Sequence, residues 1–186
     1  MLGKRVIARM IGVQSRLVRV EDVREDGDVI VVDMRPRAHM ARLCPHCWAS
    51  CPRYDKGRVR RWRAMDWARV QVFVQAQVPR VSCVEHGVVT AAVPWARHEA
   101  WHTYAFEQAA AWFATQMSAT GAAAWLRCSW RTIGTLVARV LEDLQAASGS
   151  DGLDGLARIG IDEISYRRGH FSGDPRPSPD VSSGAC

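Results

Sequence analysis

Two pairs of side chains with the spacing of zinc ligands stand in the first half of the chain. Cys44 and Cys47 are separated by two residues, and Cys83 and His86 have the same spacing. Zinc prefers a tetrahedron of sulfur and nitrogen ligands, and a two-residue gap lets a tight turn present both side chains to one ion. The pattern therefore predicts one structural Zn²⁺ site of the Cys3His type.

Two further side chains are alternative ligands for this site. His46 lies inside the first pair, and Cys51 follows it with a different spacing. The long gap between the two pairs is compatible with a hairpin that leaves one knuckle and returns to the other. A metal would supply folding energy to such a small β module. The competing interpretation treats the cysteines as small buried core residues.

The segment between the pairs is strongly basic. Residues 53–69 contain seven Lys or Arg side chains and two Asp, a local charge of +5, with Trp62 and Trp67 among them. Guanidinium groups beside indole rings suit phosphate contact and stacking, although a solvated hairpin with a tryptophan core would give the same pattern. The candidate DNA contacts of this segment are Arg58, Arg60, Arg61 and Arg63.

The composition favours a polyanionic partner in a reducing compartment. The chain has 25 Lys and Arg against 19 Asp and Glu, and all but Lys4 and Lys56 of the basic residues are Arg, which suits phosphate and guanine. Arg9 interrupts the apolar stretch at the start, so no secretory signal is predicted, and no run is long enough to span a membrane. We therefore expect a cytoplasmic protein with no membrane partner, in which paired cysteines bind metal.

The elements that must position the basic segment and the cysteines are mostly strands. Residues 13–34 contain two Val-rich runs around Asp26 and Gly27, which predicts a β-hairpin. A second strand pair is expected within residues 59–82. These patterns predict a β-rich zinc-binding module over residues 1–98.

Helical periodicity replaces the strand pattern after this module. Thr103, Ser118 and Ser129 each precede an apolar-periodic segment and can cap a helix, so a three-helix helix-turn-helix domain is predicted over residues 99–147. At 100° per residue the third helix places a polar face opposite its apolar stripe, starting at its N-terminus. The candidate base and phosphate contacts on that face are Arg131, Thr135 and Arg139.

The remainder of the chain divides by composition. Small and turn-forming residues predict a linker over 148–157, β-branched residues predict one buried strand over 158–170, and a Pro/Ser/Gly-rich tail at 171–186 is expected to be disordered.

Four motifs together carry a resemblance to a known family. CPHC, VPRVSCVEHGVV, SWRTIGTLVARV and IGIDEISYRRGH, in this order, resemble bacterial insertion-sequence transposases of the ISL-three type. That resemblance implies an N-terminal zinc region, a helix-turn-helix and an RNase-H-like DDE domain. It makes Asp162 the first of three metal-binding acids, which in a full-length member hold Mg²⁺ for phosphodiester chemistry.

The sequence thus predicts an α+β, multi-module fold: a β-rich zinc-knuckle module, a three-helix helix-turn-helix and the first strand of an incomplete RNase-H-like domain. Because the family pattern stops after His170, we expect a truncated fragment that recognises double-stranded transposon ends for DNA transposition and recombination but cannot cleave or join strands by itself. A second copy or an intact transposase is a candidate protein partner. The alternatives are a zinc-containing helix-turn-helix transcription regulator and a zinc-stabilised protein- or RNA-binding module.

Overall fold

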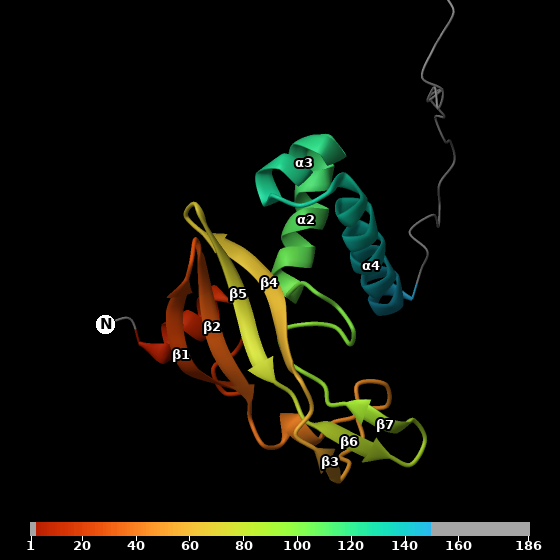
Figure 1. Ribbon diagram of the computed structural model, residues 1–186. Helices are drawn as coiled ribbons and strands as arrows, with labels where there is room; N and C mark the ends of the chain where they lie inside the picture. Colours follow the sequence, from red (N-terminus) through yellow and green to blue (C-terminus); the bar gives the residue numbers. More distant parts are fainter. Residues whose placement is uncertain (1–2, 150–186) are drawn as a thin grey trace, which may run out of the picture. The chain divides into compact units, whose positions relative to one another are not determined.

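Valine-rich segments of the first half form a four-stranded sheet in the computed structural model, which describes residues 3–149 (Figure 1). The sheet has the order β1-β2-β5-β4, and its strands are β1 (Val18–Asp26), β2 (Val29–Pro36), β5 (Val70–Gln77) and β4 (Val59–Trp67). β1 and β2 are antiparallel, as are β4 and β5, whereas β2 and β5 run parallel. Both expected strand pairs are therefore confirmed.

The first hairpin closes at the predicted Asp-Gly turn. Asp26 pairs with Val29, and Gly27 between them has a φ of +64°, which L side chains adopt only at a cost.

A second, smaller sheet carries the cysteine pairs. Its order is β3-β6-β7, all antiparallel, with β3 (Arg53–Asp55), β6 (Arg80–Cys83) and β7 (Gly87–Thr90). A short 3-10 helix, η1 (Met40–Arg42), leads into the first knuckle. The turn between β6 and β7 contains His86, so this sheet fixes the second pair of predicted ligands.

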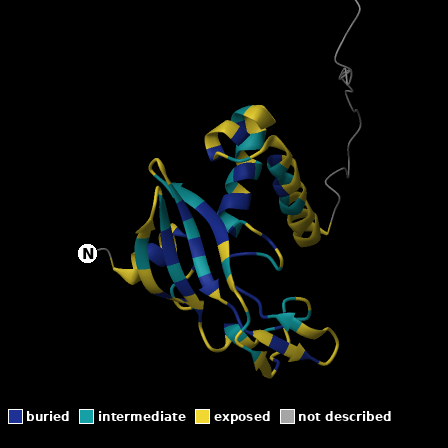
Figure 2. Ribbon diagram, in the orientation of Figure 1, coloured by how far each residue is buried: buried dark blue, intermediate teal, exposed yellow. Residues whose placement is uncertain are grey.

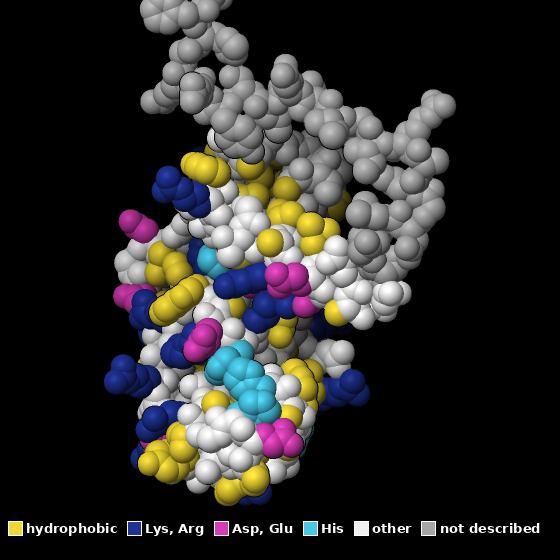
Figure 3. All heavy atoms as spheres, turned by 90° about the vertical axis from the view of Figure 1, so that its right-hand side faces the viewer, with side chains coloured by type: hydrophobic (Ala, Val, Ile, Leu, Met, Phe, Trp, Pro, Cys, Tyr) yellow, Lys and Arg dark blue, Asp and Glu magenta, His cyan; other side chains and the backbone are white. Residues whose placement is uncertain are grey.

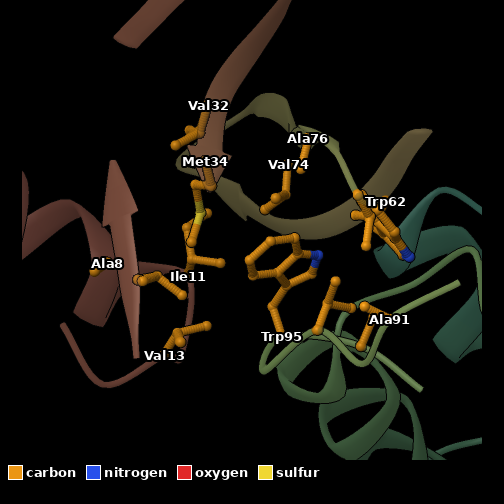
Figure 4. Close-up of a cluster of buried hydrophobic side chains, with 14 of the residues drawn as sticks. Ala8, Ile11, Val13, Val32, Met34, Trp62, Val74, Ala76, Ala91 and Trp95 are labelled. Atoms are coloured by element: carbon orange, nitrogen blue, oxygen red, sulfur yellow. The ribbon is translucent and has the colours of Figure 1, made fainter. Parts of the chain in front are cut away.

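The larger of two hydrophobic clusters lies under the four-stranded sheet. Trp62 of β4 and Trp95 meet edge to face, with ring centroids 5.5 Å apart, and Figure 4 shows Trp95 beside Val74, Met34 and Ile11. Such an arrangement suits the quadrupoles of two aromatic rings.

The sequence analysis did not foresee α1 (Lys4–Met10), which contributes Ile7 and Ala8 to this cluster. Its seven residues are too few for a clear helical periodicity, and contacts with β1 stabilise it instead.

Three helices form the second cluster, as predicted. They are α2 (Tyr104–Gln116), α3 (Ala119–Leu126) and α4 (Trp130–Ser148), and Thr103, Ser118 and Ser129 each accept a backbone N–H hydrogen bond as N-caps. The turn between α3 and α4 starts at Arg127, which is left-handed with a φ of +52°.

Burial changes along α4 (Figure 2). Ile133 and Leu136 are fully buried against α2 and α3, whereas Leu141 and Leu144 are more than half exposed. The packed part of the apolar stripe is therefore its N-terminal half. No helix within residues 3–149 is long and apolar enough to cross a bilayer.

The expected RNase-H-like strand, Asp162 and the expected tail lie outside the described residues, as does the predicted linker beyond Gly149.

Candidate metal centre and nucleic-acid interface

The four predicted zinc ligands come together at one end of the smaller sheet. The sulfur atoms of Cys44, Cys47 and Cys83 and a ring nitrogen of His86 all lie within 4.8 Å of one another. Three of the separations are shorter: 3.7 Å from Cys44 Sγ to His86 Nδ1, 3.6 Å from Cys47 Sγ to Cys83 Sγ, and 3.6 Å from Cys83 Sγ to His86 Nδ1.

The three shorter separations fit the edges of a zinc tetrahedron. A Zn–S bond of about 2.3 Å gives sulfur–sulfur edges of about 3.8 Å, and the shorter Zn–N bond makes mixed edges slightly shorter. Three thiols and one imidazole are also the donors that Zn²⁺ prefers. The cluster therefore fits a structural zinc ion in both size and chemistry.

The thiols differ in how readily they ionise. The hydrogen bond with the His86 ring, helped by backbone N–H groups, lowers the pKa of Cys83 to about 6. A backbone hydrogen bond from Ala49 lowers the pKa of Cys47, but burial and its two cysteine neighbours outweigh it and raise that pKa to about 11. Metal binding would therefore release a proton from Cys47, so affinity should increase with pH.

Neither alternative ligand belongs to the cluster. The Cys51 thiol donates a hydrogen bond to the Ala49 carbonyl, with sulfur and oxygen 3.4 Å apart. The His46 ring stacks on His86 at 4.9 Å and meets His98 edge-on at 4.9 Å. Figure 3 shows histidine side chains gathered in one patch. His46 thus packs against a candidate ligand from outside.

The N-terminal part of α4 presents to solvent two of the three side chains predicted to contact bases or phosphates. Arg131 and Thr135 are exposed, on the opposite side from buried Ile133 and Leu136. The Arg131 guanidinium lies 5.4 Å from the ring centre of Trp130, which is itself 58% exposed. This end of the helix can therefore offer a cation, a hydroxyl and an indole to a partner.

Arg139, the third predicted DNA contact of α4, faces α2 instead. Its Nη1 lies 3.4 Å from Oε1 of Glu107, a carboxylate that is fully buried. Arg97 donates to the same carboxylate at 2.6 Å and also pairs with Asp143 of α4. Arg139 thus belongs to an ion-pair network that joins α4 to α2.

The basic residues in β4 and just before it also divide into exposed and buried ones. Arg58 and Arg61 are exposed and Arg60 is half-buried, whereas Arg63 is only 7% exposed and forms an ion pair with Asp66. Asp66 pairs in turn with Arg127, at the turn before α4. Because Arg63 is buried, it does not fit the expected role of a DNA contact at the surface. Through Asp66, Arg63 instead connects β4 to the helical domain.

Sequence reasoning missed the aromatic neighbour of this basic segment. Trp101 is 67% exposed, and the guanidinium of Arg60 lies 5.6 Å from its ring centre. The signal available in the sequence was a tryptophan just before the capping Thr103, outside any periodic element.

Comparison with known proteins agrees with both parts of the site. Residues 41–86 match the zinc-finger of transposase IS204/IS1001/IS1096/IS1165, and residues 91–141 match the helix-turn-helix domain of transposase family ISL3. The chain belongs to the ISL3 transposase family. The ISL3 match covers α2, α3 and most of α4, so the interpretation as an independent transcription regulator is not favoured.

Two relatives of this ISL3 chain are each described as "Transposase for insertion sequence element IS1557", from Mycobacterium tuberculosis strains CDC 1551 / Oshkosh and ATCC 25618 / H37Rv. Each is 42% identical over 177 residues, which are 91% of this chain and 39% of the relative. The chain thus spans about two fifths of their length. No solved structure matches it.

Proposed function

We propose that the described part of this ISL3-family chain binds duplex DNA at the ends of its insertion sequence. In this proposal α4 lies in the major groove, and a zinc ion held by Cys44, Cys47, Cys83 and His86 stabilises the smaller sheet.

The exposed N-terminal face of α4 is the observation that carries the proposal. A recognition helix reads base edges from its N-terminal residues, while its opposite side packs on the preceding helices. Arg131 and Thr135 meet the first requirement, and the burial of Ile133 and Leu136 meets the second. A bidentate contact from Arg131 to a guanine edge, and a thymine methyl or phosphate contact from Thr135, are the chemically suitable roles.

Arg139 takes a supporting role in this proposal. Its ion pair with buried Glu107 fixes the orientation of α4 on α2, which is needed because side chains read bases only when the helix is held rigidly. Asp162 and the Mg²⁺ chemistry of a complete family member remain expectations from the family resemblance.

Selection from a randomised duplex library tests the proposal. The zinc-loaded 186-residue chain should enrich one motif, and that motif should occur in the terminal inverted repeats of the element that encodes it. Arg131→Ala should bind the selected duplex roughly 5- to 150-fold more weakly, the effect of losing one bidentate base contact. Arg19→Ala removes another exposed arginine, from β1, and should leave affinity unchanged. A library that yields no motif would overturn the proposal.

A further inference from the structure

An exposed tryptophan is held rigidly between the two sheets and the helices. The backbone of Trp101 is anchored because Arg63 N donates to Trp101 O at 2.8 Å, and Thr103 N donates back to Arg63 O at 2.9 Å. The Trp101 side chain is nevertheless 67% exposed. Most of the ring therefore faces solvent from a fixed backbone position, where a partner can reach it.

Arg60 contacts the Trp101 ring from the side of the core. Its guanidinium lies 5.2 Å from the ring centre of Trp62 and 5.6 Å from that of Trp101, and it donates a hydrogen bond to Ala100 O at 3.2 Å. The half-buried arginine therefore joins the exposed ring to the core tryptophan. Its charge remains next to the stacking surface, where it would favour an anion.

The groove beside Trp101 is basic. It has a volume of about 980 Å³, and its lining includes five cations, namely Lys56, Arg58, Arg60, Arg61 and Arg80. Asp55 is the only acid among the lining residues, and it pairs with Arg80. Lys56 and Arg58 are exposed and have no ion-pair partner among residues 3–149. The groove thus carries an excess of positive charge beside an aromatic face.

The same tryptophan lines a second hollow that leads towards the helix-turn-helix. This hollow, of about 440 Å³, is lined by Trp101 and Arg61 together with Arg127 and Cys128 of the turn before α4. Trp101 and Arg61 therefore connect the basic groove to the element that holds α4. Among the described residues, the unpaired positive charge lies in the groove, at Lys56 and Arg58, whereas Arg127 in the second hollow pairs with Asp66.

From this arrangement we infer that the groove binds an unpaired DNA strand, with the Trp101 ring stacked on one base. The inference rests on the proposed function, because the strand would continue from duplex held by α4. Proteins that hold single strands combine a basic groove along the backbone with aromatic rings for the bases. A duplex keeps the faces of its bases inside its own stack, so an exposed ring offers it little.

Fluorescence anisotropy with a labelled oligothymidylate of about 12 nucleotides tests this inference on the zinc-loaded full chain. Trp101→Ala should weaken single-strand binding roughly 5- to 150-fold, the effect of losing one base–aromatic stack. Trp101→Phe should restore most of the affinity, since phenylalanine keeps a ring. Trp112→Ala, at a tryptophan that is 60% exposed on α2, is the matched control and should bind like the unaltered chain.

A second variant tests the basic groove independently of the ring. Arg58→Ala should reduce the slope of log affinity against log salt by about 0.7, the contribution of one single-strand phosphate. No binding of the oligothymidylate by the unaltered chain, or equal binding by Trp101→Ala, would overturn the inference.

The selected duplex separates the two proposals. Arg131→Ala should weaken duplex binding and leave oligothymidylate binding unchanged. Trp101→Ala should weaken oligothymidylate binding and leave duplex binding unchanged. If Arg131→Ala leaves duplex binding unchanged while Trp101→Ala weakens single-strand binding, the function proposed for α4 is wrong but the single-strand site in the groove is supported.

Discussion

Removal of one zinc ligand should destabilise the protein far more than removal of a neighbouring cysteine. Cys83 and Cys51 form a matched pair, because each is 6% exposed and both belong to the larger hydrophobic cluster. They differ in that only Cys83 has its sulfur in the four-ligand cluster. Cys83→Ala and Cys51→Ala therefore remove the same atoms from similar surroundings, with and without a metal bond.

The structure sets the size of the effect. Structural zinc sites bind with roughly 10–16 kcal/mol in small peptides, whereas whole domains are stable by about 5–15 kcal/mol. Losing one of four ligands should thus cost at least about 2.5 kcal/mol, or at least about 5 °C in Tm for a chain of this size, and more if the ion is lost altogether. Cys51→Ala should cost only about 1 kcal/mol, from the lost burial of one sulfur.

Elemental analysis and thermal unfolding provide the assay. The unaltered chain and Cys51→Ala should each contain one zinc per chain, and Cys83→Ala should contain almost none. A strong chelator should lower the Tm of the first two and leave the third unchanged. Zinc retained in Cys83→Ala but lost in Cys51→Ala would show that the ligand assignment is wrong, and a zinc-free unaltered chain would refute the metal site itself.

Three further predictions concern the framework around the site. Gly57→Ala should lower the free energy of unfolding in urea by roughly 2–4 kcal/mol, because φ at Gly57 is +64° and a Cβ would lie 1.9 Å from a backbone oxygen. Gly27→Ala has the same φ but open space around the Cβ, so it should lower the free energy of unfolding by only about 1–2 kcal/mol. Equal losses in the two variants would contradict this reasoning. Glu107→Gln should destabilise the protein by roughly 1.5–3 kcal/mol, since the buried carboxylate loses its charge-assisted contacts with two partly exposed guanidinium groups, and a change below about 1 kcal/mol would argue against the network. Hydrogen bonds from Arg97 lower the pKa of Asp143, so this ion pair contributes stability above pH 3.8 and loses it as the pH falls through the lower folded-state pKa. Asp143→Asn should therefore reduce the fall of Tm at acidic pH, and an unchanged fall would exclude the ion pair as its source.

Local signals in the sequence were sufficient for α2, α3, α4 and the metal cluster. The hydroxyl caps at Thr103, Ser118 and Ser129 act within one helical turn, and the two-residue spacing of each ligand pair acts within one knuckle. Such features depend on neighbouring residues, so they can be identified without knowing the tertiary structure.

Contacts between distant segments account for what the sequence did not predict. The parallel pairing of β2 with β5 joins residues 29–33 to 71–75, and no local pattern encodes it. The basic segment made Arg63 a candidate DNA contact, but Phe106 of α2 packs over it, with the Arg63 guanidinium 5.4 Å from the Phe106 ring centre. Arg139 turns inward for the same reason, because α2 offers Glu107 beneath it.

The central claim is that this ISL3-family chain recognises insertion-sequence ends through α4, and a footprint on DNA that contains the complete element tests it most directly. The zinc-loaded chain should protect the terminal inverted repeats and leave internal and promoter sequences open, and Arg131→Ala should lose that protection at the same protein concentration. Protection spread evenly along the DNA, or protection of the repeats that survives Arg131→Ala, would contradict the claim.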